Sequence, residues 1–203
     1  MMYSMYRQQI IIFLTLLLSV FSSSLWAQNL QTGDIIFHTS RSAQSAVIQK
    51  ATHSPYSHMG LIVQKNHQWW VLEAVQPVKY TPLKTWIARG VKGHYVVKRY
   101  HKNLTTVQQQ RLIQTAERSL GKPYDLYFAW DDQAIYCSEI VWKAYQHALG
   151  IQLAPLQKLQ DFDLSDVKVK VLMQQRYGKH IPLQETVIAP QAIFASKQLR
   201  VVK

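Results

Sequence analysis

The sequence predicts a single α+β domain that follows a short N-terminal export signal. Its 203 residues fit one domain rather than two, and 48% of them are hydrophobic. Charged residues make up only 17% of the chain, which argues against a disordered or fibrous protein. Short extended runs and longer runs with helical spacing of apolar residues follow one another without internal repeats. These observations favour a packed core built from both strands and helices.

The first 27 residues have the pattern of a secretory signal peptide. Arg7 precedes an apolar run over 10–21, and small and polar residues then lead to Ala27. The run is shorter than the roughly 20 residues that a membrane-spanning helix needs. We therefore expect cleavage before Gln28, a mature domain over 28–203, and a periplasmic or secreted location. An uncleaved membrane anchor is the alternative, whereas a lipoprotein is excluded because no cysteine lies near the end of the run.

Strands dominate the first part of the mature chain. A turn at Gly33 opens the first strand, and apolar residues recur at helical spacing shortly after it. Two later extended runs are joined by the polar residues 65–67, which is the pattern of a β-hairpin. We expect strands over 33–37, 58–64, 69–75 and 95–100, and a helix over 42–52.

Helices dominate the second part. Two runs with an apolar face each end at a glycine, which is a common helix stop. We expect these helices over 105–120, before Gly121, and over 138–149, before Gly150. The chain beyond Gly150 has a weaker pattern, in which only a short helix after Pro190 and a strand near 199–202 are predicted.

Cys137 is the only cysteine, and it lies in the first turn of the second predicted helix. A single cysteine excludes an internal disulfide, a CxxC redox pair and a zinc site built on cysteines. The unpaired N–H groups and the macrodipole of a helix N-terminus favour the thiolate, which is the nucleophilic form of sulfur. Free cysteines are more often inert core residues, but an exposed thiol in an oxidising compartment is a liability unless it is used. A nucleophile and a core residue therefore both stay open.

The hairpin supplies a candidate base and a carboxylate to orient it. If residues 65–66 form the loop, His58 stands opposite Glu73, and if residues 66–67 form it, Glu73 is the diagonal neighbour of His58. Both registers place the two side chains on one face of the sheet, because side-chain direction along a strand has period two. A three-residue loop would separate them. A structural histidine and a solvent-facing glutamate are the ordinary alternative, but a carboxylate in an apolar run is costly without a partner.

Several motifs occur in an order that resembles a known enzyme family. The chain resembles the YiiX/YebB-like cysteine hydrolases of the NlpC superfamily in the segments Gly33-Asp34, Thr52-His53-Ser54-Pro55-Tyr56-Ser57-His58-Met59-Gly60, Glu73-Ala74, Gly121-Lys122-Pro123-Tyr124-Asp125 and Tyr136-Cys137-Ser138-Glu139. The resemblance covers roughly residues 30–145, and a weaker similarity is found at residues 188–190. It implies a circularly permuted papain-like fold, with a small antiparallel sheet or half-barrel packed with helices. It also implies that Cys137 is the nucleophile, His58 the base and Glu73 the orienting residue.

The predicted chemistry is attack by a thiolate on an amide or ester carbonyl, which gives an acyl-enzyme and requires no cofactor. For an exported protein of this resemblance, the favoured substrate is an amide in a cell-wall peptide. The second candidate is a lipid or acyl ester or amide, for which the aromatic stretches 69–70 and 127–130 would form an acyl pocket. Acyl transfer stays open, because lecithin:retinol acyltransferase shares the permuted arrangement. A third candidate, from a different class, is a non-catalytic module that binds an envelope ligand.

Two tyrosines flank the predicted catalytic residues. Tyr56 precedes the histidine and Tyr136 precedes the cysteine, so either hydroxyl is a candidate for the oxyanion hole or for contact with substrate. Most tyrosines in such positions simply pack.

Charge and motifs limit the partners. Lys and Arg number 23 against 11 Asp and Glu, so the protein carries a net charge of +12 and is expected to meet anionic envelope polymers and lipid head groups. Neither a nucleic-acid recognition motif nor a glycine-rich phosphate loop is present, so no nucleic acid or nucleotide cofactor is expected. His53 and His58 are five residues apart around a proline, a spacing that fits no metal-ligand pattern, and no metal is expected. The sequence does not predict the oligomeric state.

Overall fold

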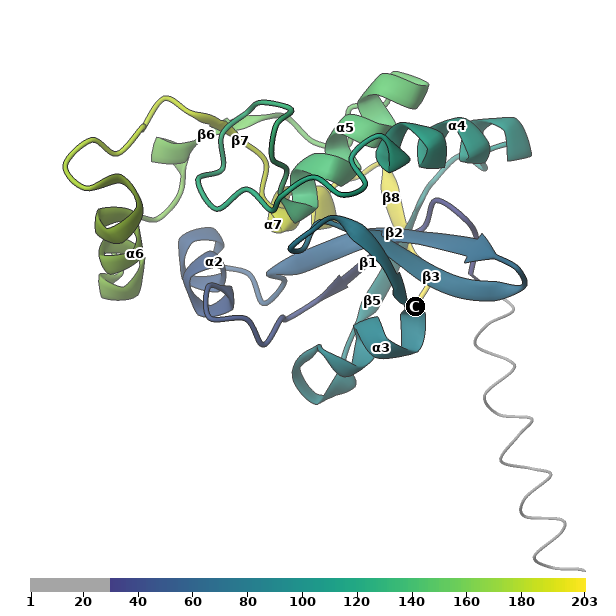
Figure 1. Cartoon of the computed structure of the whole chain (residues 1–203), viewed down its shortest axis with the longest axis horizontal. Helices are drawn as coiled ribbons and strands as arrows, with labels where there is room; N and C mark the ends of the chain where they lie inside the picture. Colours follow the sequence, from purple (N-terminus) through teal and green to yellow (C-terminus); the bar gives the residue numbers. More distant parts are fainter. Residues whose placement is uncertain (1–29) are drawn as a thin grey trace, which may run out of the picture. The chain divides into compact units, whose positions relative to one another are not determined.

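A six-stranded antiparallel sheet, in the order β4-β3-β2-β1-β5-β8, organises the chain (Figure 1). The structure is a computed structural model that describes residues 30–203, and residues 31–203 form one unit. The predicted signal peptide over 1–27 lies outside the described residues. The sheet is built from β1 (Ile35–His38), β2 (His58–Lys65), β3 (Gln68–Glu73), β4 (Lys79–Pro82), β5 (Val96–Tyr100) and β8 (Leu199–Val201). A second sheet pairs β6 (Gln157–Lys158) with β7 (Thr186–Val187).

The helices are α2 (Ser45–Thr52), α3 (Leu83–Ala88), α4 (Thr106–Glu117), α5 (Cys137–Leu149), α6 (Val167–Tyr177) and α7 (Pro190–Phe194), with short 3₁₀ turns η1 (Val91–Gly93) and η2 (Leu159–Asp161). The α+β class predicted from the sequence is therefore confirmed. Among the helices of residues 30–203, none combines the length and the apolar character that a bilayer crossing requires.

Several elements were not expected from the sequence: β4, α3 and α6, the two-residue strands β6 and β7, and the 3₁₀ turns. Valine and lysine alternate over 167–171, which is a strand pattern. The segment is nevertheless helical, because Asp166 caps it by accepting a hydrogen bond from the Lys168 N–H at 2.9 Å. Val169 and Met173 are buried one turn apart and pack against α2. Tertiary packing thus outweighs the local alternation.

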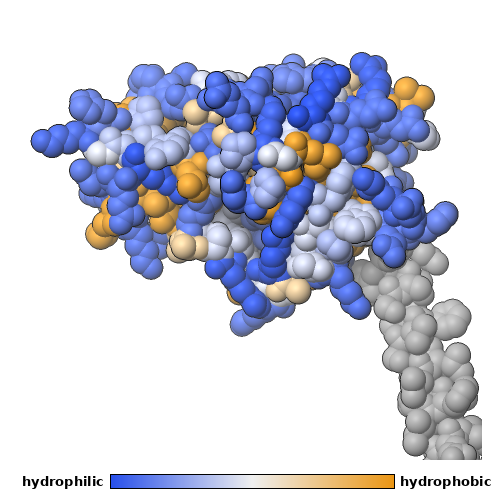
Figure 2. Space-filling model, in the orientation of Figure 1, coloured by the Kyte–Doolittle hydropathy of each residue, from blue (hydrophilic) through white to orange (hydrophobic). Residues whose placement is uncertain are grey.

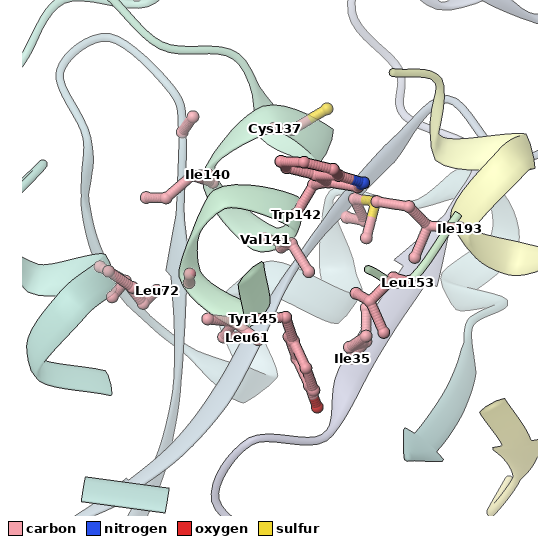
Figure 3. Packing of buried hydrophobic residues seen from close by; sticks show 14 of the residues in the cluster. Ile35, Leu61, Leu72, Cys137, Ile140, Val141, Trp142, Tyr145, Leu153 and Ile193 are labelled. Carbon is pink, nitrogen blue, oxygen red and sulfur yellow. The ribbon is translucent and has the colours of Figure 1, made fainter. Parts of the chain in front are cut away.

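The sheet carries different helices on its two faces (Figure 1). Helix α5 packs against β2, with α4 beside it, and its buried side chains form the main core with alternate strand residues such as Ile35, Leu61 and Leu72 (Figure 3). The intervening strand residues face the opposite side, where Trp86 of α3 is fully buried. Because side chains alternate along a strand, His58 and Glu73 belong to the α3 side of the sheet rather than to the α5 side.

The hairpin between β2 and β3 fixes the register on which the site depends. Lys65 pairs with Gln68, so Asn66 and His67 form the two-residue loop. Both loop residues have positive φ, 49° and 59°, as a type I′ turn requires. This is the second of the two predicted registers, in which Glu73 is the diagonal neighbour of His58. Continuing the pairing by one residue places Gly60 opposite Glu73, and a glycine there leaves room for the Glu73 side chain.

Gly60→Ala should destabilise the protein, because a Cβ at this position would lie 2.5 Å from Val71 Cγ1 and 2.8 Å from the Leu72 carbonyl oxygen. We expect the free energy of unfolding to fall by about 1–3 kcal/mol, the usual cost of overpacking. Chemical denaturation checks this. Gln64→Ala, an exposed change on the same strand, should cost less than about 0.5 kcal/mol, and equal losses in the two variants would contradict the close-packing argument.

Candidate active site

Cys137 is the first residue of α5, and its side chain is buried. Two contacts hold this end of the helix. The Glu139 carboxylate accepts from the Tyr136 N–H at 3.2 Å, and the Ser138 hydroxyl donates to the Ile188 carbonyl at 2.7 Å. Figure 3 shows the sulfur at the tip of the helix, pointing away from core residues such as Ile140 and Val141. Since the first N–H groups of a helix have no partner within it, negative charge on or beside the sulfur is favoured here.

His58 and Glu73 form a hydrogen-bonded pair, with His58 Nε2 2.6 Å from Glu73 Oε2. Glu73 is completely shielded from solvent. Its other oxygen, Oε1, accepts from the Thr81 hydroxyl at 2.5 Å and from the Arg89 guanidinium. The carboxylate is therefore satisfied at both oxygens, and it fixes the plane of the imidazole ring through Nε2.

The His58 ring also contacts the Cys137 thiol. Burial alone would lower the pKa of His58, but hydrogen bonds to Cys137 and Glu73 and attraction to their negative charges outweigh burial and raise that pKa to about 9. Because Nε2 is occupied by Glu73, the nitrogen that remains for the thiol is Nδ1. Burial likewise would raise the pKa of Glu73, yet His58, Thr81 and Arg89 together lower it to about 2. Cysteine, histidine and glutamate thus form one continuous hydrogen-bonded chain.

An aromatic wall backs the His58 ring. His38 pairs with His58 across β1 and β2, and it stacks on Trp86 with ring centroids 3.8 Å apart. Burial and the nearby charges of His58 and Arg89 lower the pKa of His38 to about 3, and the negative charge of Glu73 offsets only a small part of this shift. His38 is therefore neutral and does not compete with His58 for Glu73. A Cβ at Gly90 would lie 2.9 Å from His38 Nδ1, so this wall requires a glycine behind it.

The two flanking tyrosines are not placed alike. The Tyr56 ring stacks on Phe194 at 4.0 Å between centroids and lines neither cavity at the site, which is a packing position. Tyr136 is buried beside the thiol, and its hydroxyl accepts from the Ile188 N–H at 3.1 Å. The structure brings Cys137, His58 and Glu73 together, brings Tyr136 next to them, and leaves Tyr56 in an aromatic stack.

Two cavities adjoin Cys137 and His58. One is an apolar pocket of about 80 Å³ next to Cys137, whose lining includes Ala51, Phe128, Phe162, Val169, Met173 and Ile188. The other is an open cleft of about 1120 Å³ next to His58. Phe128 belongs to the aromatic stretch expected in an acyl pocket, whereas Trp69 and Trp70 line neither cavity, so that part of the expectation is wrong.

Comparison with known proteins identifies the family. The model of a permuted papain-like amidase family, YaeF/YiiX, C92, matches residues 29–203. The chain belongs to this family. An uncharacterized protein YiiX of Escherichia coli (strain K12) is 55% identical over 192 residues, which cover 95% of this chain and 94% of that protein. The crystal structure of metalloprotein yiiX from Escherichia coli O157:H7 aligns with a TM-score of 0.84 at 58% identity and covers 86% of this chain and 97% of that one.

Membership of the permuted papain-like amidase family confirms the YiiX-like resemblance and the fold predicted from the motifs. It also agrees with an amide-cleaving hydrolase. The wider placement in the NlpC superfamily stays a prediction.

Because the protein of that crystal structure is described as a metalloprotein, the residues of this chain are compared with the requirements of a metal site. Within residues 30–203, no group of three or more His, Cys, Asp or Glu side chains is arranged to hold a metal ion. His53 is paired with Asp163 at 3.1 Å on the surface, and His58 is paired with Glu73. The described residues therefore do not fit a metal centre.

Sequence reasoning missed several residues of the site. Thr81 and Arg89 are the further partners of Glu73. Thr81 lies on β4 and Arg89 directly follows α3, and neither element was expected. Tyr124 and Gln44 line both cavities, and the Gln44 amide donates to the Tyr124 hydroxyl at 2.8 Å. Tyr124 lies in one of the family motifs, which was the only signal that could have found it.

Cys137 should react with iodoacetamide near neutral pH much faster than a model thiol of pKa about 8.5. The physical reason is the imidazolium of His58, which stays protonated up to about pH 9 and contacts the sulfur. His58→Ala should slow the reaction, as read by intact mass against time. Alkylation of the native protein at the rate of the model thiol would contradict the assignment of Cys137 as the nucleophile.

Proposed function

We propose that this protein is an exported cysteine amidase in which Cys137 is the nucleophile, His58 the general acid and base, and Glu73 the residue that orients His58. The observation that carries the proposal is the hydrogen-bonded chain from thiol to imidazole to buried carboxylate. Nucleophile, base and orienting group within hydrogen-bond reach are the signature of covalent acyl transfer. A non-catalytic module would have no use for a carboxylate buried behind a histidine that contacts a thiol.

The reaction proceeds in two halves. The thiolate attacks the carbonyl carbon, the C–S bond forms, and the tetrahedral intermediate collapses as the C–N bond breaks and the amine takes a proton from His58. Water then attacks the thioester, gives a proton to His58, and releases the acid together with the thiolate. The N–H of Cys137 at the start of α5 is the proposed oxyanion donor. All chemistry is assigned to the chain's own residues.

Two substrate classes follow from this mechanism. An amide in a cell-wall peptide is the first candidate, on the proposal that the protein is exported into the envelope. A lipid or acyl amide or ester is the second, and the apolar pocket beside Cys137 favours it. The pocket lies on the side of the nucleophile, where the acyl group is held during the reaction, and its apolar lining matches a hydrocarbon chain or a bulky apolar side chain.

Glu73→Gln should lower turnover by roughly 10- to 1,000-fold, because an amide still accepts from the ring but stabilises the imidazolium less. The kcat/KM profile of the native enzyme should fall as the pH rises through about 9, where His58 loses the proton that the leaving group needs. Since Glu73 helps to raise the pKa of His58, this alkaline limb should move to lower pH in the variant. Steady-state kinetics against pH measure both effects.

Cys137→Ala is the reference for loss of the covalent route and should abolish turnover. Glu139→Gln is the matched control, because Glu139 is a buried carboxylate two residues from Cys137 that pairs with Lys143 at 2.7 Å and not with His58. If Glu139→Gln loses turnover while Glu73→Gln keeps it, Glu73 is not the residue that orients His58.

Ala51→Leu should separate the substrate classes, because Ala51 lines the apolar pocket. Muropeptides and dodecanoyl amides are incubated side by side with the native enzyme and the variant. If the second candidate is correct, the native enzyme cleaves the dodecanoyl amide, and a larger side chain in the pocket raises its KM by roughly 10-fold, in line with the loss of a few buried methylene groups. Ala195→Leu, an exposed change outside both cavities, should have no effect. Cleavage of muropeptides alone, insensitive to Ala51→Leu, would select the first candidate.

A further inference from the structure

The two cavities meet the catalytic pair from different sides. Cys137 lines the apolar pocket and not the cleft, whereas His58 lines the cleft and not the pocket. Gln44 and Tyr124 line both, so they lie at the boundary between the two cavities. A substrate at the thiol can therefore extend in two chemically different directions.

The mechanism assigns one half of the substrate to each direction, and this step rests on the proposed function. The acyl carbon becomes bonded to the Cys137 sulfur, so the acyl part lies on the side of the apolar pocket. The leaving group takes its proton from His58, so it lies on the side of the cleft. The chemistry of the cleft lining then reports on the leaving group.

Besides the His58 imidazolium, the charged residues that line the cleft are all cationic: Arg41, Arg89, Lys168 and Arg176. No Asp or Glu is among the lining residues. Arg89 forms an ion pair with Glu73, although 41% of its side chain stays exposed. Within residues 30–203, the other three cations have no carboxylate at ion-pair distance. Arg41 lies in the segment before α2, and Lys168 and Arg176 lie near the two ends of α6, so two parts of the chain bring cations to the cleft.

Arg176 is the best positioned of these cations. Its Nη2 donates to the Gln44 side chain at 2.8 Å, and its guanidinium lies over the Phe128 ring, 5.2 Å from the centroid. Its Nη1 is buried and has no hydrogen-bond partner within the described chain. The charge of Asp125 attracts the guanidinium, but Asp125 forms no ion pair with it and does not line the cleft. Arg176 is thus held in one orientation at the cleft, with part of its donor capacity unused.

We propose that the leaving group of the substrate carries an anionic group, a carboxylate or a phosphate, which Arg176 binds in the cleft with support from Arg41 and Lys168. An arginine donates two parallel hydrogen bonds to either anion. The substrate would then be an amphiphile, with an apolar acyl part beside Cys137 and an acidic amine component beside His58. The surface agrees with such a ligand, since Figure 2 shows apolar side chains gathered over α2 and α6 among hydrophilic ones.

The test uses substrates that share one acyl group and differ only in the leaving group. N-dodecanoylglycine presents a carboxylate, N-dodecanoyl-O-phosphoethanolamine presents a phosphate, and N-dodecanoylglycinamide is neutral. We expect kcat/KM to be roughly 10- to 100-fold higher for an anionic compound than for the neutral one, as for a charged hydrogen bond. The two anionic arms show which anion is preferred. The preference should shrink as the salt concentration rises.

Variants locate the effect. Arg176→Gln, and the double change Arg41→Gln with Lys168→Gln, should each reduce the anionic-to-neutral ratio of kcat/KM, chiefly through KM. Lys170→Gln is the matched control, because Lys170 lies on the same helix and is exposed but does not line the cleft. Lys170→Gln should leave the ratio unchanged. An equal loss in this control would show that the preference comes from the overall charge of the protein and not from the cleft.

A binding measurement separates this inference from the proposed function. Calorimetry with the Cys137→Ala protein compares the affinities of the same three compounds without any turnover. Tighter binding of an anionic compound, lost in Arg176→Gln, supports the inference even if no cleavage occurs. The inference is overturned if the anionic and neutral compounds bind equally or not at all and the native enzyme cleaves them at equal rates. In that case, loss of cleavage in Cys137→Ala would still support the cysteine mechanism.

Discussion

A carboxylate without any contact to solvent is the constraint on which the site depends. Burying Glu73 as an ion would cost several kcal/mol unless its oxygens were paired, and the pairing comes from β2 (His58), β4 (Thr81) and the end of α3 (Arg89). The same requirement that keeps the carboxylate ionised therefore holds three elements in one arrangement. The imidazole is aligned as a consequence, because it is one of the groups that the carboxylate needs.

The site lies where the two faces of the sheet meet. His58 and Glu73 belong to the face covered by α3, whereas Cys137 begins the helix that covers the other face. The two halves can make contact only because His58 is the first residue of its strand and Cys137 the first residue of its helix. The end of an element gives a side chain access to both sides, and this explains why neither His58 nor Cys137 stands in the middle of one.

The part of the site that could be predicted is the part with local geometry. Period-two alternation predicted that His58 and Glu73 share a face, and the helical pattern that ends at Gly150 predicted that Cys137 lies in the first turn of a helix. The register needed the structure, because either of two loops satisfied the pattern and the positive φ of Asn66 and His67 decided between them. Residues such as Thr81, Arg89 and His38 act through packing of segments distant in the sequence, and nothing in their local pattern indicates this.

The separation between hairpin and helix also has a consequence for how the protein matures. The base and its carboxylate come from neighbouring strands, so their pairing closes only a short loop, while the thiol arrives from a helix much further along the chain. During synthesis, the segment with the histidine precedes the segment with the cysteine. A partly folded chain can thus hold the histidine ready without a competent sulfur beside it, and reactivity is acquired only when the long-range docking of α5 is complete.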